Sequence, residues 1–409
     1  MPQPFDVAAV RAQFPILSQS LGARPLVYLD NAASAQKPLA VLEAVRAFDS
    51  TDYANIHRGV HTLSQRATLA YEAARVAVQR FLHAAHDHEV IFTRGTTESF
   101  NLLAWSWGRH NLGPSDAVIL SAMEHHANIV PWQLLAQERG FALRVIPVLG
   151  DGTLDLEAAR AHLRAPGARL LSVTHVSNAL GTINPVEELI EAAHAVGALV
   201  ALDGAQAVPH LAVDVQALGC DFYAFSAHKL FGPTGVGILY GRAELLAQMP
   251  PFMGGGDMIE RVSFEGTTFA APPARFEAGT PNITGAIGLA AALGWLQDLD
   301  LAGAHAHEAA LLADATARLR AIPGIELVGT APRKVPVLSF TLAGAHADDL
   351  GMILDQMGVA VRTGHHCAQP LMAALGVRAT ARASFAFYNT HQEVEALAHA
   401  VQTAARLLT

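Results

Sequence analysis

One lysine lies where a lysine could do covalent chemistry. Lys229 is in YAFSAHK, directly after an apolar, strand-like run, and the turn-rich sequence LFGPTGVG follows it. Such a lysine could simply lay its methylene stem along apolar surface. It could also form a Schiff base with a carbonyl cofactor, and Ser226 and His228 would then bind the phosphate of that cofactor.

Acidic and hydroxyl residues follow two other strand-like runs. Asp203 could cap a helix, or it could hold the protonated ring nitrogen of pyridoxal 5'-phosphate (PLP), the cofactor expected on the lysine. Gln206, three residues later, could reach the phenolic oxygen of PLP. Gly95, Thr96 and Thr97 open a predicted helix, whose N–H groups and hydroxyls could bind a phosphate or only cap the helix.

Further side chains could move protons or sulfur. His125, in MEHHANIVPW, could stack on the cofactor ring and transfer protons, or it could be structural. Cys367 lies in VRTGHHCAQP, a polar, basic loop that favours the nucleophilic thiolate, whereas Cys220 in ALGCDFY is typical of a buried apolar residue. Arg382 could bind an α-carboxylate or form a salt bridge. A zinc site is not expected, because the 20 histidines show no CxxC or HExxH spacing.

The segments that must position these residues alternate between strand-like and helical patterns. Helical periodicity covers residues 65–82 and 186–196. The alternation predicts an α/β fold with a mainly parallel sheet and helices on both faces. Ligands of such sheets bind beyond the carboxyl ends of the strands, where the residues above lie. Strands are expected at residues 27–29, 90–93, 117–121, 143–147, 170–174, 199–203, 222–225 and 236–240.

The pattern changes near residue 299, where a smaller α+β domain is expected. It contains a long helix, strand-like runs at residues 335–341 and 359–362, and a closing helix at residues 392–408. We therefore expect an N-terminal segment (1–25) packed on the small domain, a large cofactor-binding domain (26–298) and a C-terminal domain (299–409) that carries the cysteine loop.

Composition limits the classes of ligand and the compartment. The 409 residues are 51% hydrophobic and 15% charged, as in globular proteins, and the net charge of -9 argues against a nucleic-acid surface. No apolar stretch is long enough for a membrane span, and the first residues lack a secretory signal. Two cysteines allow at most one disulfide, so a reducing cytoplasm is expected.

The motifs in their order along the chain resemble those of the group II cysteine desulfurases of the SufS/CsdA type. The matching segments are FPIL, YLDNAASAQKP, NIHRGVHTLS, FTRGTTE, EHHANIVPW, HVSNALGTINP, DGAQAV, SAHKLFGPTGVG, MPPFMGGGDMI, FEAGTPN, RTGHHCAQP and RASFAFYNT. The family's lysine motif usually reads SGHK, and Ala227 stands here in the glycine position. We expect local repacking to accommodate that methyl group.

The resemblance implies a fold-type I, class V aminotransferase-like homodimer and a role for each matched residue. Asn178 and Arg382 would bind the carboxylate of the substrate, and Cys367 would carry its sulfur as a persulfide. The others would hold PLP: Lys229, Asp203, Gln206, His125 stacked on the ring, and Thr97, Ser226 and His228 on the phosphate, with Thr280 serving the PLP of the other subunit.

The activity implied by the resemblance is a PLP-dependent cysteine desulfurase. Lys229 would take the Cα proton of L-cysteine, His125 would serve the substrate thiol as acid or base, and the Cys367 thiolate would attack the sulfur. The products would be L-alanine and a persulfide, which passes to a SufE- or SufU-type acceptor for iron–sulfur cluster assembly. A selenocysteine lyase with the same site and a non-catalytic scaffold are the alternatives. The cysteine loop is short, so its thiol is expected to be restrained and to need a partner.

Overall fold

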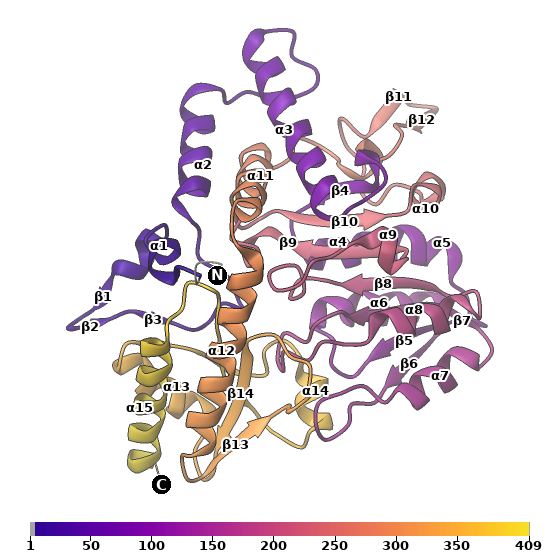
Figure 1. The fold of residues 1–409 in the computed structure, drawn as a ribbon. Helices are drawn as coiled ribbons and strands as arrows, with labels where there is room; N and C mark the ends of the chain where they lie inside the picture. The colour runs from indigo at the N-terminus through magenta and orange to yellow at the C-terminus, as the bar shows by residue number, and fades with distance from the viewer. Residues whose placement is uncertain (1–4, 409) are drawn as a thin grey trace.

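A seven-stranded sheet forms the centre of the larger part of the molecule (Figure 1). The computed structural model describes residues 5–408. β10 pairs antiparallel with both of its neighbours, whereas the five strands from β9 to β6 run parallel. The strand order is β4 (Val90–Thr93), β10 (Gly237–Gly241), β9 (Phe222–Ser226), β8 (Leu199–Asp203), β7 (Ala168–Thr174), β5 (Ala117–Ser121) and β6 (Ala142–Ile146).

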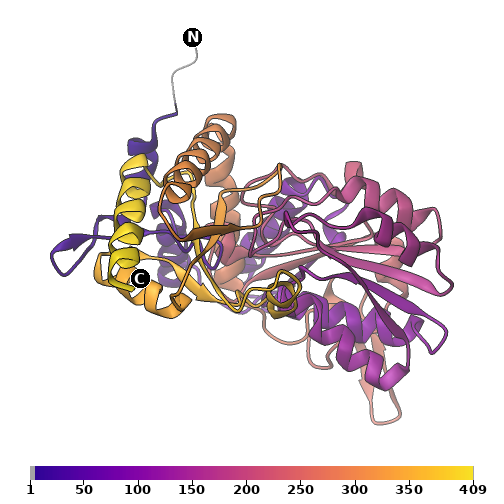
Figure 2. The ribbon, with the colours of Figure 1, turned by 90° about the horizontal axis from the view of Figure 1, so that it is seen from below.

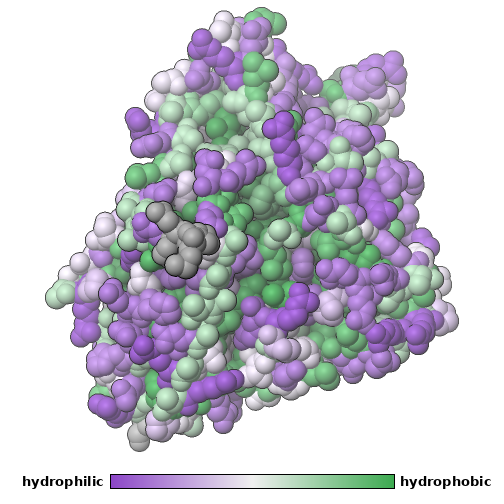
Figure 3. Space-filling model, viewed as in Figure 1, coloured by the Kyte–Doolittle hydropathy of each residue, from purple (hydrophilic) through white to green (hydrophobic). Residues whose placement is uncertain are grey.

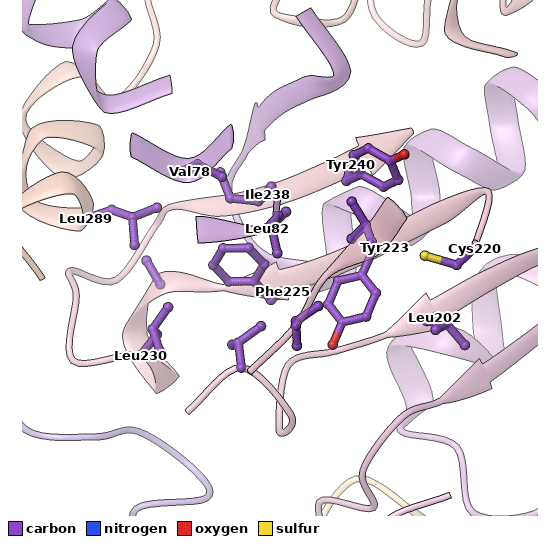
Figure 4. Close-up of a cluster of buried hydrophobic side chains, with 14 of the residues drawn as sticks. Val78, Leu82, Leu202, Cys220, Tyr223, Phe225, Leu230, Ile238, Tyr240 and Leu289 are labelled. Carbon is purple, nitrogen blue, oxygen red and sulfur yellow. The ribbon is translucent and has the colours of Figure 1, made fainter. Parts of the chain in front are cut away.

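Helices cover both faces of this sheet, so its central strands are buried along most of their length. Side chains alternate between the two faces of a strand. In β9, Tyr223 and Phe225 face the layer that contains Val78 and Leu82, from α3 (Thr62–Phe81) and the residue after it, as Figure 4 shows. Phe222 and its alternate neighbours face the opposite layer, with α4 (Thr96–Leu103) and α6 (Val130–Arg139). The α/β fold with a mainly parallel sheet is therefore confirmed.

The first layer also contains α7, α8 and α11, and the remaining elements of the large domain connect or flank the sheet. Their bounds are α2 (Leu39–Thr51), α5 (Arg109–Asn111), α7 (Leu156–Arg164), α8 (Val186–His194), α9 (Val215–Leu218), α10 (Ala243–Gln248), α11 (Ile283–Gln297) and the hairpin β11 (Ile259–Ser263) and β12 (Gly266–Phe269). A π-helix, η3 (Ala104–Gly108), joins α4 to α5. Short 3-10 turns lie at η1 (Pro15–Ser18), η2 (Asp87–Glu89), η4 (His126–Asn128), η5 (Ala227–Lys229) and η6 (Ala274–Phe276).

The C-terminal part has its own antiparallel sheet and its own apolar core. The sheet order is β13 (Ile325–Val328), β14 (Val337–Leu342), β17 (Thr380–Ser384) and β16 (Arg362–Gly364). The core includes apolar residues of α12 (Leu301–Arg320), α13 (Ala347–Gln356) and α15 (His391–Leu408). α14 (Gln369–Ala374) follows the cysteine loop.

The N-terminal segment packs on both parts of the chain: Phe14 contacts Phe231 and Trp295 of the large domain, and other residues contact the smaller domain. β3 (Val27–Tyr28) pairs in parallel with β15 (Val359–Ala360), so the expectation that residues 27–29 form a strand of the large sheet is wrong. α1 (Val7–Arg11) lies beside α15, as Figure 2 shows, and Arg11 pairs with Glu393 at 2.9 Å. The short pair β1 (Ser20–Leu21) and β2 (Arg24–Pro25) lies between them in the chain. No described helix is long and apolar enough to cross a membrane.

Candidate active site

The carboxyl ends of five strands of the large domain enclose a cavity of about 200 Å³ together with β16, β17 and the cysteine loop of the smaller domain. The residues of the large domain follow β4, β5, β7, β8 and β9, as the parallel sheet requires. The lining brings together most of the predicted site residues: Thr96, Thr97, His125, Asn178, Asp203, Ser226, His228, Lys229, Cys367 and Arg382. Arg362 and His366 complete the polar part of the wall.

Lys229 ends a short 3-10 helix after β9, and its environment favours the neutral amine. Its Nζ donates a hydrogen bond to Oε1 of Gln206 at 3.3 Å. Burial lowers the pKa of Lys229 to about 8, although the carboxylate of Asp203 opposes this shift. Ala227 is fully buried in the same 3-10 helix, so the methyl group in the expected glycine position is accommodated.

Asp203 is a buried carboxylate at the end of β8. It is 5% exposed, and its Oδ1 accepts the backbone N–H of Ala205 at 2.9 Å. Burial raises its pKa, and the nearby ammonium of Lys229 lowers it. The next residue must be Gly204, because a Cβ there would lie 2.0 Å from the ring of Tyr223. This glycine lets the backbone after the carboxylate pass close to the Tyr223 ring.

Hydroxyl and N–H groups gather at the N-terminus of α4. The Oγ of Ser226 accepts the backbone N–H of Thr96 at 2.8 Å and lies 2.7 Å from its Oγ1. Gly95 precedes the helix with φ 154°, and β10 passes so close that a Cβ on Gly237 would lie 2.3 Å from its Cα. Such a helix N-terminus with hydroxyls beside it is suited to a phosphate.

His125 is held as a neutral imidazole by its own turn. Its Nδ1 accepts the backbone N–H of Ala127 at 3.0 Å, so the ring proton is on Nε2. Burial, and then the charge of Lys229, lower its pKa to about 3. The next residue, His126, joins this turn to the cysteine loop: its N–H donates to the carbonyl of Cys367 at 2.7 Å, and its Nε2 accepts from Gln369 at 3.1 Å.

The cysteine loop is held in an unusual backbone conformation. His366 and Cys367 have φ values of 52° and 55°, in the left-handed region that non-glycine residues seldom adopt. Asn178 fixes this loop by donating from Nδ2 to the carbonyl of His366 at 2.7 Å. Cys367 is half-buried, with its Sγ 3.7 Å from Nη2 of Arg362. Sequence reasoning missed Arg362, and its only signal was a second cation five residues before the cysteine.

Arg382 is 1% exposed and lies at the inner wall of the cavity. Its Nη1 donates to the carbonyl of Asn178 at 2.8 Å, and its Nη2 to Oδ1 of Asp30 at 3.0 Å. Its Nε has no partner in the protein. Asp30 is also a contact that sequence reasoning missed, although it lies within the YLDNAASAQKP motif. One edge of the guanidinium is therefore paired, and a buried N–H remains for a ligand.

Thr280 is the predicted site residue that lies elsewhere. It lines a separate cavity of about 470 Å³ together with Glu277, whose carboxylate pairs with Arg75 at 2.7 Å. The chain alone therefore does not bring Thr280 to Lys229, and its role at the other subunit stays a prediction. Within residues 5–408, no three His, Cys, Asp or Glu side chains are grouped so that they could hold a metal ion.

The donors and acceptors of the cavity fit PLP. A buried carboxylate on Asp203 could pair with a protonated ring nitrogen, and the hydroxyls of Thr96 and Ser226 with a phosphate. The amine of Lys229 could bond to the aldehyde, and the partnerless Nε of Arg382 leaves a donor for a substrate carboxylate.

Comparison with known proteins gives the same family. The profile described as Aminotransferase class-V matches residues 27–397. Two curated relatives named cysteine desulfurase, from Klebsiella pneumoniae subsp. pneumoniae and Dickeya dadantii, are 55% and 53% identical; they match 99% of this chain, and 99% and 98% of their own.

Two solved structures agree over their whole length. The cysteine desulfurase CsdA from Escherichia coli has a TM-score of 0.92 at 44% identity, and the cysteine desulfurase from Thermococcus onnurineus NA1 has 0.93 at 39%; both comparisons cover 100% of each chain. The chain therefore belongs to the class-V aminotransferases and, within that PLP-dependent family, to the cysteine desulfurases.

Proposed function

We propose that this protein converts L-cysteine to L-alanine and keeps the released sulfur as a persulfide on Cys367. The observation that supports this most directly is that a lysine with a lowered pKa and a half-buried cysteine line the same small cavity. Lys229 comes from the large domain and Cys367 from the smaller one, so the junction between the domains forms the reaction site.

The cofactor residues would act through charge. When bound, PLP supplies an electron sink that stabilises negative charge next to the substrate's amino group. Asp203 would keep the ring nitrogen protonated, because a buried carboxylate pairs with a cation at little further desolvation cost. Lys229, whose pKa is about 8, has a useful fraction of free amine near neutral pH and would move the Cα proton.

Arg382 and Asn178 would bind the carboxylate of the substrate, and the neutral imidazole of His125 would exchange a proton with its thiol. Arg382 offers its buried Nε, and Asn178 lies beside it in the cavity wall. His125 carries its proton on Nε2 and would exchange a proton with the substrate thiol. The Cys367 thiolate then attacks that sulfur: an S–S bond forms, the C–S bond breaks, and its electron pair goes to Cβ. Protonation of Cβ and return of a proton to Cα by Lys229 complete L-alanine.

The proposal includes an acceptor of the SufE or SufU type, and iron–sulfur cluster assembly as the use of the sulfur. Two large-domain residues donate hydrogen bonds to backbone carbonyls of the loop with Cys367: His126 from its backbone N–H and Asn178 from its side-chain amide. A thiol held in this way cannot travel far, so the acceptor has to approach it. Release of the persulfide would then limit steady turnover, and an acceptor thiol should raise the steady rate but leave the first burst of alanine unchanged.

A homodimer in the cytoplasm is also part of the proposal. Thr280 lies outside the cavity of its own chain, and the hairpin of β11 and β12 exposes Val262 and Phe264 fully or largely to solvent. A two-fold contact could bury such side chains and bring Thr280 to the other active site. Both cysteines are free, which suits a reducing compartment. Sedimentation of a fully active monomer would contradict the dimer.

The decisive experiment measures both products together. Purified holoenzyme is incubated with L-cysteine, alanine is quantified, and the persulfide is located by mass spectrometry. Wild-type protein should give one persulfide per chain on Cys367, Cys367→Ala should bind PLP but give none, and the control Cys220→Ala should behave as wild type, because Cys220 is fully buried. A persulfide on Cys220, or alanine without any persulfide, would refute the proposal. The Cys367→Ala variant is also assayed with selenocysteine. Formation of alanine from selenocysteine but not from cysteine would support the selenocysteine lyase alternative.

A further inference from the structure

A larger cavity, of about 570 Å³, lies between α12 and the start of the small-domain sheet. α12 lines it with a stripe of residues three or four apart, which includes Glu308, Leu312 and Arg320. Figure 3 shows a hollow of mainly apolar surface beside α12, with polar side chains around it. The apolar walls include Ile183, Leu211, Leu312, Leu327, Pro336 and Leu338. No residue of this lining belongs to the catalytic cavity.

An incompletely paired carboxylate lies at one end of this cavity. Glu308 is 2% exposed, and its Oε2 lies 3.0 Å from Nδ1 of His210. Its Oε1 has no hydrogen-bond partner in the protein. His305, one turn earlier on α12, lines the same end. A buried carboxylate oxygen without a partner is costly, so a ligand that donates a hydrogen bond would be favoured here.

Two cations without an acidic partner lie at the other end. Burial, and then the charge of Arg320, lower the pKa of Lys334 to about 8. The Nζ of Lys334 donates to the carbonyl of Gly329, and neither cation forms an ion pair with a described carboxylate. A half-buried amine beside a guanidinium would gain from an anion, and a carboxylate would also restore the ordinary pKa of the lysine.

We propose that this cavity binds a short, apolar, extended peptide, with its terminal ammonium on Glu308 and its terminal carboxylate between Lys334 and Arg320. The opposite charges at the two ends set the direction of the ligand, and the apolar walls between them accept its side chains. Glu308 and Arg320 are about 18 Å apart along the helix. The arginine side chain shortens that span, and four extended residues cover roughly 14 Å.

The charges at the two ends also decide against other small ligands. A fatty acid would satisfy the cations but would place its methyl end on the carboxylate of Glu308, and an amine would leave Lys334 without an anion. A single amino acid carries both charges on one carbon and cannot reach both ends of the cavity. The site therefore goes beyond the proposed desulfurase activity, which needs neither group.

Calorimetric titration of the holoenzyme with the tetrapeptide Ala-Leu-Ala-Leu tests the proposal. The free peptide should bind saturably with one site per chain. Its N-acetylated form loses the ammonium, and its C-terminal amide loses the carboxylate, so each should bind at least tenfold more weakly. A competition with L-cysteine checks the location, because a peptide bound in the catalytic cavity would be displaced.

Substitutions at the basic end complete the test. Lys334→Gln and Arg320→Gln should each weaken peptide binding about tenfold, whereas Arg333→Gln, an exposed neighbour outside the cavity, should leave it unchanged. Arg320 is exposed at the end of its helix, so its replacement decides the matter if the Lys334 variant does not fold. No saturable binding, equal binding of the blocked peptides, unchanged binding in both variants or displacement by L-cysteine would overturn the proposal.

Discussion

The lowered pKa of Lys229 predicts how fast the apoenzyme takes up PLP at each pH. Attack on the cofactor's aldehyde needs the neutral amine. Burial lowers the pKa of Lys229 to about 8, from an ordinary value of 10.5. At pH 7 the neutral fraction is then about 10%, against roughly 0.03% for an ordinary lysine, so the structure predicts attachment about 300-fold faster than for an exposed amine.

Replacement of Arg362 should raise the pH midpoint of PLP attachment. Arg362 is one of two arginines whose charge helps to lower the pKa of Lys229. Arg362→Gln removes that repulsion, so the pKa should rise and attachment at pH 7 should slow by several-fold. Arg169→Gln is the matched control, because that arginine is exposed and outside the catalytic cavity.

The assay follows the absorbance of lysine-bound PLP after the apoenzyme is mixed with a saturating concentration of cofactor between pH 6 and pH 10. The rate constant should rise with pH and level off above pH 8, with a higher midpoint in the Arg362 variant. Lys229→Ala gives the baseline without covalent attachment. A wild-type midpoint near pH 10, or a lower midpoint in Arg362→Gln, would refute the reasoning that burial and neighbouring cations set this pKa.

Three further predictions concern the thiol, the phosphate cradle and the buried ion pair. Brief iodoacetamide treatment of the native protein should label Cys367 and leave Cys220 free, because burial raises the pKa of Cys220 to about 12; peptide mapping that finds equal labelling would contradict this. Gly237→Ala should lower the free energy of unfolding by ~1–3 kcal/mol in urea and weaken PLP binding, whereas Gly266→Ala, with open space around it, should do neither. Asp30→Asn removes the carboxylate that pairs with the buried guanidinium of Arg382, so the free energy of unfolding in urea should fall by about 2 kcal/mol. An unchanged urea midpoint would show that the pair does not stabilise the fold.

The sequence predicted the central strands well because burial on both faces leaves continuous apolar runs. β4, β5 and β8 lie at the predicted residues. β17 was missed, because the apolar positions of TARAS are alanines, which are weak strand formers, and its burial comes from pairing with β14 and β16. The strand at Val27 was found but assigned to the wrong sheet, since two apolar residues do not specify which edge they will join.

The site was predictable where the parallel sheet positions it. Side chains after β8 and β9 must meet at one edge, which is why Asp203 and Lys229 could be placed together from their order alone. Asp30 contacts Arg382 from a loop that follows β3, and Arg362 lines the cavity from the smaller domain. Their approach depends on how the domains pack, and no local pattern in the sequence records that packing.

The ion pair between Asp30 and Arg382 can form only near the end of synthesis. The two residues are 352 positions apart, and the cysteine loop is likewise among the last parts of the chain to be made. Every large-domain residue of the catalytic cavity, up to Lys229, is translated earlier. At ~5–20 residues per second, roughly 8 to 30 seconds pass on the ribosome between Lys229 and Arg382. A nascent chain therefore contains Lys229 well before it contains Cys367 and Arg382, so an unfinished molecule lacks part of the wall of this cavity.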